Sequence, residues 1–178
     1  QGEDVIESSD GGFVITGNQD NNGDNAKAFL RKYSSSGEVL WNNTFSSSNY
    51  NEGISLIEAS DSSLVFVGFS GTSHGAYKHF MVRTDADGNQ IWKKRFGNNT
   101  QQSLNAVCEA LDGSFVGTGY SNNYDDLYIV KRNREGDQEW EKIIDYSEND
   151  DWDTDQGNDI ILANDEGFYI LGSTNMYP

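Results

Sequence analysis

The sequence is poor in several residue types, and each shortage excludes a class of protein. Among 178 residues there are one cysteine, one proline, two histidines and two methionines. A single cysteine, Cys108, cannot form an intramolecular disulfide, so the chain is not a disulfide-stapled scaffold. No cluster of thiolate or histidine metal ligands is present, and no segment shows a helical period. The apolar neighbours of Cys108 instead predict a small, buried hydrophobic residue.

Basic residues are scarce as well. The chain has 12 lysines and arginines against 29 acidic residues, a net charge of −17. This field repels phosphates and anionic lipids, so we expect neither nucleic acid nor a membrane surface as a partner. No apolar run approaches the length that spans a bilayer, so we expect no membrane insertion. The charge is typical of a protein kept soluble in a salty or extracellular setting.

What the sequence does contain is a repeat. A segment that starts with Asp and ends with Gly seven residues later occurs four times, and the copies begin 51, 51 and 53 residues apart. The copies are Asp10–Gly17, Asp61–Gly68, Asp112–Gly119 and Asp165–Gly172. Each predicts a turn that opens a short apolar strand. A fixed period of this size is the signature of a repeat architecture.

The residues around each copy predict four short strands per repeat. In the first repeat the expected strands are 3–7, 13–17, 28–33 and 39–45, and the last repeat supplies only 159–163 and 168–172. The fourth strand carries a tryptophan four residues after a turn glycine, in the pairs Gly37/Trp41, Gly88/Trp92 and Gly136/Trp140. We expect these tryptophans to be packing residues.

Repeating four-stranded units are typical of β-propeller blades, which bury their faces only against neighbouring blades. We therefore expect one all-β domain, a β-propeller with three complete four-stranded antiparallel blades and the first two strands of a fourth. The expected blades are about 1–50, 51–101 and 102–153, followed by a half blade at 154–178. Because rings have about four to eight blades, we expect the remaining blades from the same longer chain or, alternatively, from a second subunit.

The combined pattern resembles a known repeat. Asp-Gly-Gly-Phe-Val at residues 10–14, a later strand ending in Lys or Arg, and the Gly-x-x-x-Trp turn look like the β-propeller repeat of secreted and surface proteins of bacteria and archaea. They are also similar to the blades of quinoprotein-dehydrogenase-like propellers. Sialidase-type Asp boxes differ, with three residues from glycine to aromatic where this chain has four. The resemblance implies the fold and an extracellular or cell-surface location, whereas many functions use this repeat.

An acidic stretch at 151–159 is the most specific candidate site. It has the pattern D-x-D-x-D-x-G-x-D, with potential ligands Asp151, Asp153, Asp155, Gly157 and Asp159. Alternating carboxylates and a backbone carbonyl can surround Ca²⁺, and the stretch resembles the calcium loops of some propellers, including integrin heads. Against this, Gln156 replaces the usual glycine, and Gly157 and Asp159 are also repeat positions. The alternative is a solvated acidic loop between blades.

Loop aromatics form a weaker candidate for ligand contact. Trp152 lies among acids, and Tyr124, Tyr77 and Tyr50 are other aromatic residues in predicted loops. An exposed ring beside carboxylates and amides suits stacking on a sugar, whereas the alternative is packing within the loops. Lys32, Arg83 and Lys131 share one repeat position. For these we favour a repeated ion pair with the turn aspartates, or a solvated strand end, over a basic ring that binds an anion.

Catalysis has little support, because His74 and His79 have no serine or cysteine nucleophile arranged around them. We therefore expect a non-enzymatic extracellular or surface module that binds or displays a protein or glycan ligand, with Ca²⁺ as its one candidate cofactor. A first alternative is a calcium-assisted, lectin-like propeller. A second is a fragment of a propeller enzyme, quinone-dependent or hydrolytic.

Overall fold

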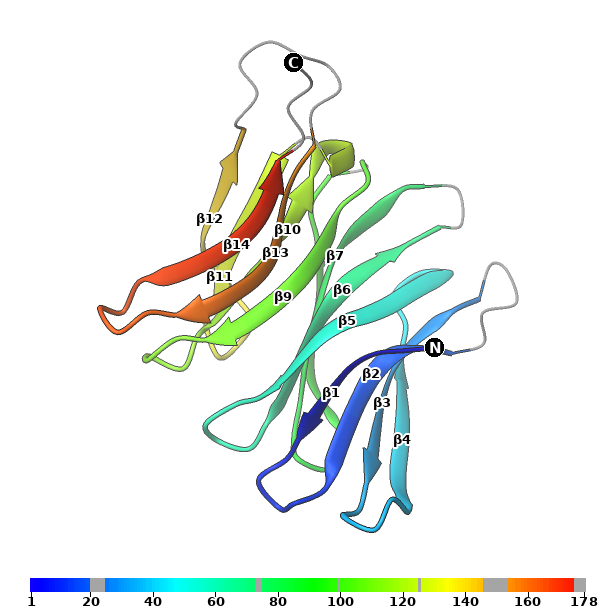
Figure 1. The fold of residues 1–178 in the computed structure, drawn as a ribbon. Coiled ribbons are helices and arrows are strands. Elements are labelled where there is room, and N and C mark those ends of the chain that lie inside the picture. Colours follow the sequence, from blue (N-terminus) through cyan, green and yellow to red (C-terminus); the bar gives the residue numbers. More distant parts are fainter. Residues whose placement is uncertain (20–24, 73–74, 99, 125, 146–153, 175–178) are drawn as a thin grey trace.

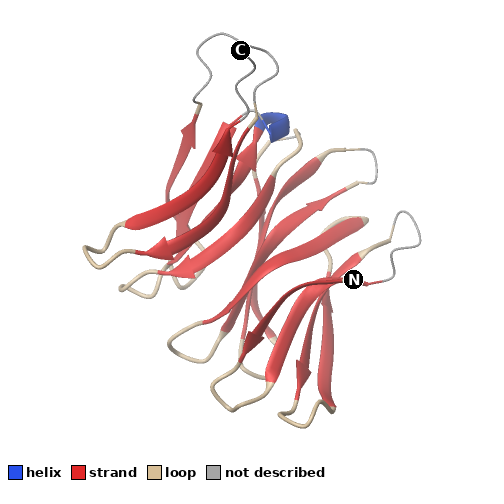
Figure 2. Ribbon diagram, in the orientation of Figure 1, coloured by secondary structure: helices blue, strands red, loops and turns tan. Residues whose placement is uncertain are grey.

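The computed structural model describes residues 1–19, 25–72, 75–98, 100–124, 126–145 and 154–174. These residues form antiparallel β-strands and one 3₁₀ turn, η1 (Asn122–Tyr124), as Figure 2 shows. Among them, no helix is long and apolar enough to cross a membrane.

The strands form three four-stranded sheets and one two-stranded sheet, and in each sheet the neighbours follow sequence order. The first sheet contains β1 (Gly2–Glu7), β2 (Phe13–Gln19), β3 (Lys27–Tyr33) and β4 (Val39–Phe45). The second contains β5 (Tyr50–Glu58), β6 (Leu64–Gly71), β7 (Tyr77–Thr84) and β8 (Gln90–Phe96). The third contains β9 (Ser103–Glu109), β10 (Phe115–Ser121), β11 (Asp126–Arg132) and β12 (Gln138–Ile144). The fourth contains β13 (Asp155–Leu162) and β14 (Phe168–Thr174).

The predicted all-β architecture of repeated antiparallel units is therefore confirmed, including the two-stranded last unit. Several strands are longer than predicted: β2 ends at Gln19 rather than at residue 17, β14 ends at Thr174 rather than at residue 172, and β13 begins at Asp155 rather than at residue 159. The additional residues of β13 pair with the end of β14, with Asp155 opposite Thr174. Residues 155–158 are polar and lack β-branched side chains, which made them look like a loop in the sequence.

The sheets stack face to face in a fan (Figure 1), and the first strand of each sheet packs against the first three strands of the preceding one. In this way β5 contacts β1, β2 and β3, β9 contacts β5, β6 and β7, and β13 contacts β9, β10 and β11. The described sheets form an open stack, not a closed ring.

Glycines allow the close approach of successive sheets. A Cβ atom on Gly53 in β5 would overlap the Thr16 hydroxyl of β2, and one on Gly157 in β13 would overlap the Thr118 hydroxyl of β10. Both glycines lie at a register shift in their strand. Each threonine hydroxyl is itself anchored, since Thr16 donates to the carbonyl of Phe29 at 3.0 Å.

One apolar cluster fills each interface between sheets. The residues of these clusters alternate along their strands, as expected where one face of a sheet is buried. Members include Leu30, Phe66 and Phe80 at the first interface, Val67, Met81, Leu104 and Phe115 at the second, and Val116, Ile129 and Ile160 at the third. Trp92 belongs to the second cluster, and Trp41 and Trp140 pack against the other two, which confirms their predicted role as packing residues.

Candidate functional site

The two ends of the sheets differ (Figure 1). At one end, the first and second strands and the third and fourth strands of a sheet are joined by tight turns. The four turns of the first type close with the same backbone hydrogen bond of 2.8–2.9 Å: Ser8 to Gly12, Ala59 to Ser63, Ala110 to Ser114 and Ala163 to Gly167. We call this the turn end. The opposite end, the loop end, carries the connections from second to third strands and from each sheet to the next, and these differ in sequence among repeats.

A repeated ion pair occupies the turn end. Lys32 lies 2.7 Å from Asp10, Arg83 lies 2.5 Å from Asp61, and Lys131 lies 2.6 Å from Asp112. The predicted pairing of these basic residues with turn aspartates is thus confirmed. Hydrogen bonds from Lys32 and from the N–H of residue 12 hold the pKa of the Asp10 carboxyl well below its usual range. Lys131 and Ser114 have the same effect on the pKa of Asp112. These cations are already neutralised and do not form a ring that could bind an anion.

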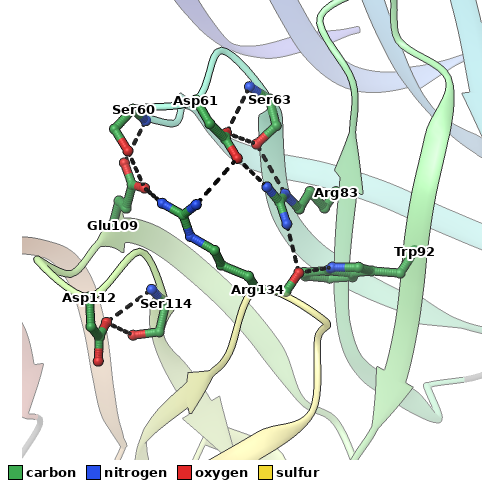
Figure 3. A network of polar contacts seen from close by, with 9 residues as sticks. All are labelled: Ser60, Asp61, Ser63, Arg83, Trp92, Glu109, Asp112, Ser114 and Arg134. Carbon is green, nitrogen blue, oxygen red and sulfur yellow. Dashed lines mark hydrogen bonds and ion pairs between the residues drawn. The ribbon is translucent and has the colours of Figure 1, made fainter.

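Turns of one sheet are also capped by glutamates of the next. The backbone N–H and hydroxyl of Ser9 donate to the carboxylate of Glu58 at 2.7 and 2.6 Å. Ser60 donates to Glu109 in the same way, at 2.6 and 2.8 Å, as Figure 3 shows. Each pair spans 49 residues and joins neighbouring sheets. The carboxylates of Glu58 and Glu109, which share one repeat position, therefore hold neighbouring sheets together.

Arg134 extends this network between the second and third sheets (Figure 3). Its backbone carbonyl accepts one hydrogen bond from Arg83 and one from the Trp92 indole, both at 2.7 Å. Its guanidinium lies 3.9 Å from Asp61 and 3.8 Å from Glu109. The ion pairs and caps in the turns of the first three sheets are thus committed to structure, and a ligand site is better sought at the loop end.

Three aromatic rings meet at the loop end of the second sheet. The Tyr77 ring centroid lies 4.7 Å from that of Phe69 and 6.2 Å from that of Tyr50. Tyr50 and Phe69 stack at 5.7 Å, with an interplanar angle of 7°. All three residues are half-buried. Tyr77 and Tyr50 were predicted as loop aromatics, but they are the first residues of the strands β7 and β5. Phe69 was missed because the predicted strand ended at Gly68, whereas β6 continues to Gly71.

An acidic group with an altered pKa adjoins these rings. The Tyr50 hydroxyl lies 3.4 Å from the Glu52 carboxylate. Burial raises the pKa of Glu52, the nearby Glu3 adds to this rise, and a hydrogen bond with Asn18 opposes it. Asn18 is 2% exposed, and its amide oxygen accepts no hydrogen bond from the residues that the structure describes. Rings beside a carboxylate and a buried amide combine apolar surface with the polar groups that orient a small ligand.

Two other predicted aromatics are not placed. Tyr124 ends η1, but its side chain lies outside the described residues. Trp152 also lies outside them, and so do Asp151 and Asp153 of the predicted calcium loop. Their roles stay predictions.

The remaining residues of the calcium prediction lie in β13. Asp155 is buried, and the Gly157 carbonyl accepts a hydrogen bond from the Asn105 amide at 2.9 Å. Asp159 is exposed and accepts the N–H of Ile160 at 2.8 Å. Gly157 and Asp159 of the predicted calcium pattern therefore also belong to the repeat. Within the described ranges, no three His, Cys, Asp or Glu residues are grouped as metal ligands would be.

The first sheet shows what the repeat uses the Asp159 position for. Asp4 stands at that position, and one of its oxygens accepts the N–H of Val5 at 2.7 Å. Its other oxygen accepts the N–H of Leu56 in the next sheet, at 2.8 Å. Asp4 therefore joins two sheets. Asp159 occupies the same repeat position, and a role for it in binding calcium stays a prediction.

Two residues with potential reactivity are packed in unreactive forms. His79 is fully buried, its Nε2 lies 3.0 Å from the Tyr120 carbonyl oxygen, and its ring stacks on Tyr128 at 4.0 Å. Burial lowers the pKa of His79 to about 4. Cys108 was predicted to be buried but is half-buried. Burial raises the pKa of its thiol to about 12, so the thiol stays protonated at neutral pH.

No protein-family model matches the chain, and no curated protein matches it significantly.

Proposed function

We propose that the chain is a section of a β-propeller and acts as a non-enzymatic extracellular or surface module that binds a protein or glycan through its loop end. The observation that carries this proposal is the contrast between the two ends. At the turn end, successive repeats reuse the same ion pairs and backbone bonds. At the loop end, each repeat has its own sequence. Loops that vary on a constant scaffold are where binding specificity usually lies.

The propeller arrangement is supported by the repeated packing of sheets. Each of the three interfaces places the first strand of one sheet across three strands of the preceding sheet. A constant step of this kind, applied to enough blades, produces a ring.

A second candidate function is favoured by a specific observation. The rings of Tyr50, Phe69 and Tyr77 meet beside Glu52. This group supports a lectin-like role, in which the aromatic faces stack on a sugar and the carboxylate accepts its hydroxyl groups. Calcium, if the acidic stretch at 151–159 binds it, would organise the neighbouring loops.

Both candidates are tested by probing the protein on a glycan array and on an array of extracellular proteins, with calcium and with a chelator. We expect a ligand whose binding is lost in Tyr77→Ala and retained in Tyr33→Ala, which replaces a half-buried tyrosine at the turn end. Glycan binding that disappears with chelator would select the lectin-like role. Equal loss in both variants, or substrate turnover by the purified chain, would contradict the proposed function.

A further inference from the structure

Three basic side chains share one face of the second sheet near its loop end. Lys93 and Arg95 are two residues apart in β8, so their side chains point to the same face. Arg95 lies opposite Phe80 of β7, and Lys78 lies two residues before Phe80 on that strand. Phe80 belongs to the buried cluster of the first interface, so this face is the one that packs against the first sheet. We call Lys78, Lys93 and Arg95 the basic cluster.

No carboxylate forms an ion pair with the basic cluster in the part of the chain that the structure describes. Each side chain instead donates a hydrogen bond to a backbone carbonyl of the loop end: Lys78 to Gly97 at 3.2 Å, Lys93 to Ser46 at 2.6 Å and Arg95 to Ser70 at 3.2 Å. Arg95 is exposed, and the two lysines are half-buried. Because a carbonyl carries only a partial charge, these cations retain a strong attraction for an anion.

The basic cluster is not part of the repeat. Its positions are occupied in the first sheet by Lys27, Asn42 and Thr44, and in the third sheet by Asp126, Glu141 and Ile143. The third sheet thus has two acids where the second has two lysines. The ion pairs of the turn end, by contrast, keep their charges from one repeat to the next. The stacking of sheets therefore does not require the basic cluster, which is specific to the second sheet.

Aromatic rings that can contact a sugar lie at the same end of this sheet. Tyr77 directly precedes Lys78 in β7. Phe69 directly precedes Ser70, the residue whose carbonyl accepts the hydrogen bond of Arg95. The ring centroids of Tyr77 and Phe69 are 4.7 Å apart. Successive residues of a strand point to opposite faces, so an oligosaccharide that crosses this end of the sheet can stack on the rings and place an acid group at the cations.

The overall charge of the chain limits the charge of such a ligand. At −17 the chain repels a polyanion, but the field of distant carboxylates is screened beyond about 8 Å at physiological ionic strength. A ligand with isolated acid groups therefore gains from the basic cluster and loses little to the rest of the surface. Two residues apart on a strand is about 7 Å, which allows Lys93 and Arg95 to hold one acid group between them.

We propose that the basic cluster binds the carboxylate or sulfate group of an acidic sugar within a glycan that the loop end recognises. The planar guanidinium of Arg95 matches the paired oxygens of such a group, and the two lysines add point charges beside it. This inference rests on the proposed function and adds the chemical class of its ligand, an acidic glycan.

The test is isothermal titration calorimetry of the full chain with four probes. These are a tetrasaccharide of galacturonic acid, its methyl ester, a sulfated galactose tetrasaccharide and a hexa-aspartate peptide. We expect binding of the carboxylated or the sulfated sugar at low salt, weaker binding at high salt because the charges are screened, and no binding of the methyl ester. The charged sugar that binds identifies the acid group that the cluster recognises.

Three variants locate the binding. Lys93→Gln and Arg95→Gln should each weaken binding of the charged sugar about tenfold, because a charge-assisted hydrogen bond is lost. The matched control is Lys94→Gln, which removes the same charge from the opposite face of β8, where Lys94 lies 3.4 Å from Asp137. It should leave the affinity unchanged. Equal melting temperatures of native chain and variants would show that the loss of binding is not a loss of fold.

The outcomes separate this inference from the proposed function. Absence of binding of both charged sugars, or equal losses in Lys94→Gln and Arg95→Gln, would overturn the inference. Tighter binding of hexa-aspartate than of either sugar would assign the basic cluster to an acidic peptide and also overturn it. A protein or neutral glycan whose binding is lost in Tyr77→Ala but retained in Arg95→Gln would uphold the proposed function and overturn only this inference.

Discussion

At the scale of single residues, the interfaces between sheets contain polar groups that burial would otherwise destabilise. Lys32 and Arg83 are buried, and each is neutralised by an aspartate at the rim of its interface. His79 is buried, and within the described part of the chain its Nδ1 has no hydrogen-bond partner. The aspartates thus stabilise the charged forms of Lys32 and Arg83, whereas the surroundings of His79 stabilise the neutral form of its ring. The two kinds of group therefore respond to pH in different ranges.

We predict that His79 makes the fold sensitive to mild acid. Its pKa is about 4 in the folded chain, below its ordinary value of 6.5. The unfolded chain therefore takes up the proton first, and the stabilisation that is present above pH 6.5 is lost as the pH falls towards 4. The free energy of unfolding should drop by about 2 kcal/mol between pH 7 and pH 5, measured by urea denaturation.

The matched variant is His79→Phe, which keeps a ring against Tyr128. Its stability should be nearly constant between pH 7 and pH 5, whatever its absolute value. The lowered pKa values of Asp10 and Asp112 give a stabilisation that is present above their ordinary range and lost only below about pH 4. Parallel pH profiles for the two proteins would show that His79 is not the sensitive group.

At the scale of elements, a turn of one sheet is fixed by a glutamate at the end of the next sheet's first strand. We predict that Glu109→Ala lowers the free energy of unfolding by about 1–2 kcal/mol, because the N–H and hydroxyl of Ser60 lose their acceptor. Thermal and urea denaturation would measure the change. The control is Glu7→Ala, since Glu7 occupies the same repeat position in the first sheet and caps no turn in the described part of the chain. Equal effects in the two variants would mean that the cap contributes nothing specific.

The cap of Ser60 by Glu109 also shows which features of the fold the sequence could and could not predict. The strands, the packing tryptophans and the pairing of Lys32 with its turn aspartate all follow from spacing within one repeat. Ser60 and Glu109 are 49 residues apart and lie in different sheets, so their contact depends on how sheets stack. Likewise, Phe69 joins Tyr50 and Tyr77 only when β5, β6 and β7 are aligned. The early start of β13 could not be predicted because pairing with β14 overrides the weak strand preference of its residues.

At the scale of the whole molecule, each sheet depends on its neighbours for burial, so stability should fall towards the ends of the stack. The repeat positions of Val65 and Val67 in β6 are occupied in β14 by Tyr169 and Leu171. The two valines are fully buried, whereas Tyr169 is 68% and Leu171 is 67% exposed. β14 also lacks a pairing strand on one side in the described chain. It should therefore open locally with far less free energy than β6.

We predict that backbone amide hydrogen exchange is at least tenfold faster in β14 than in β6, measured by mass spectrometry after brief deuteration and digestion. The control is β2, which is paired on both sides and should exchange more slowly than β14. Exchange in β14 as slow as in β6 would contradict the prediction.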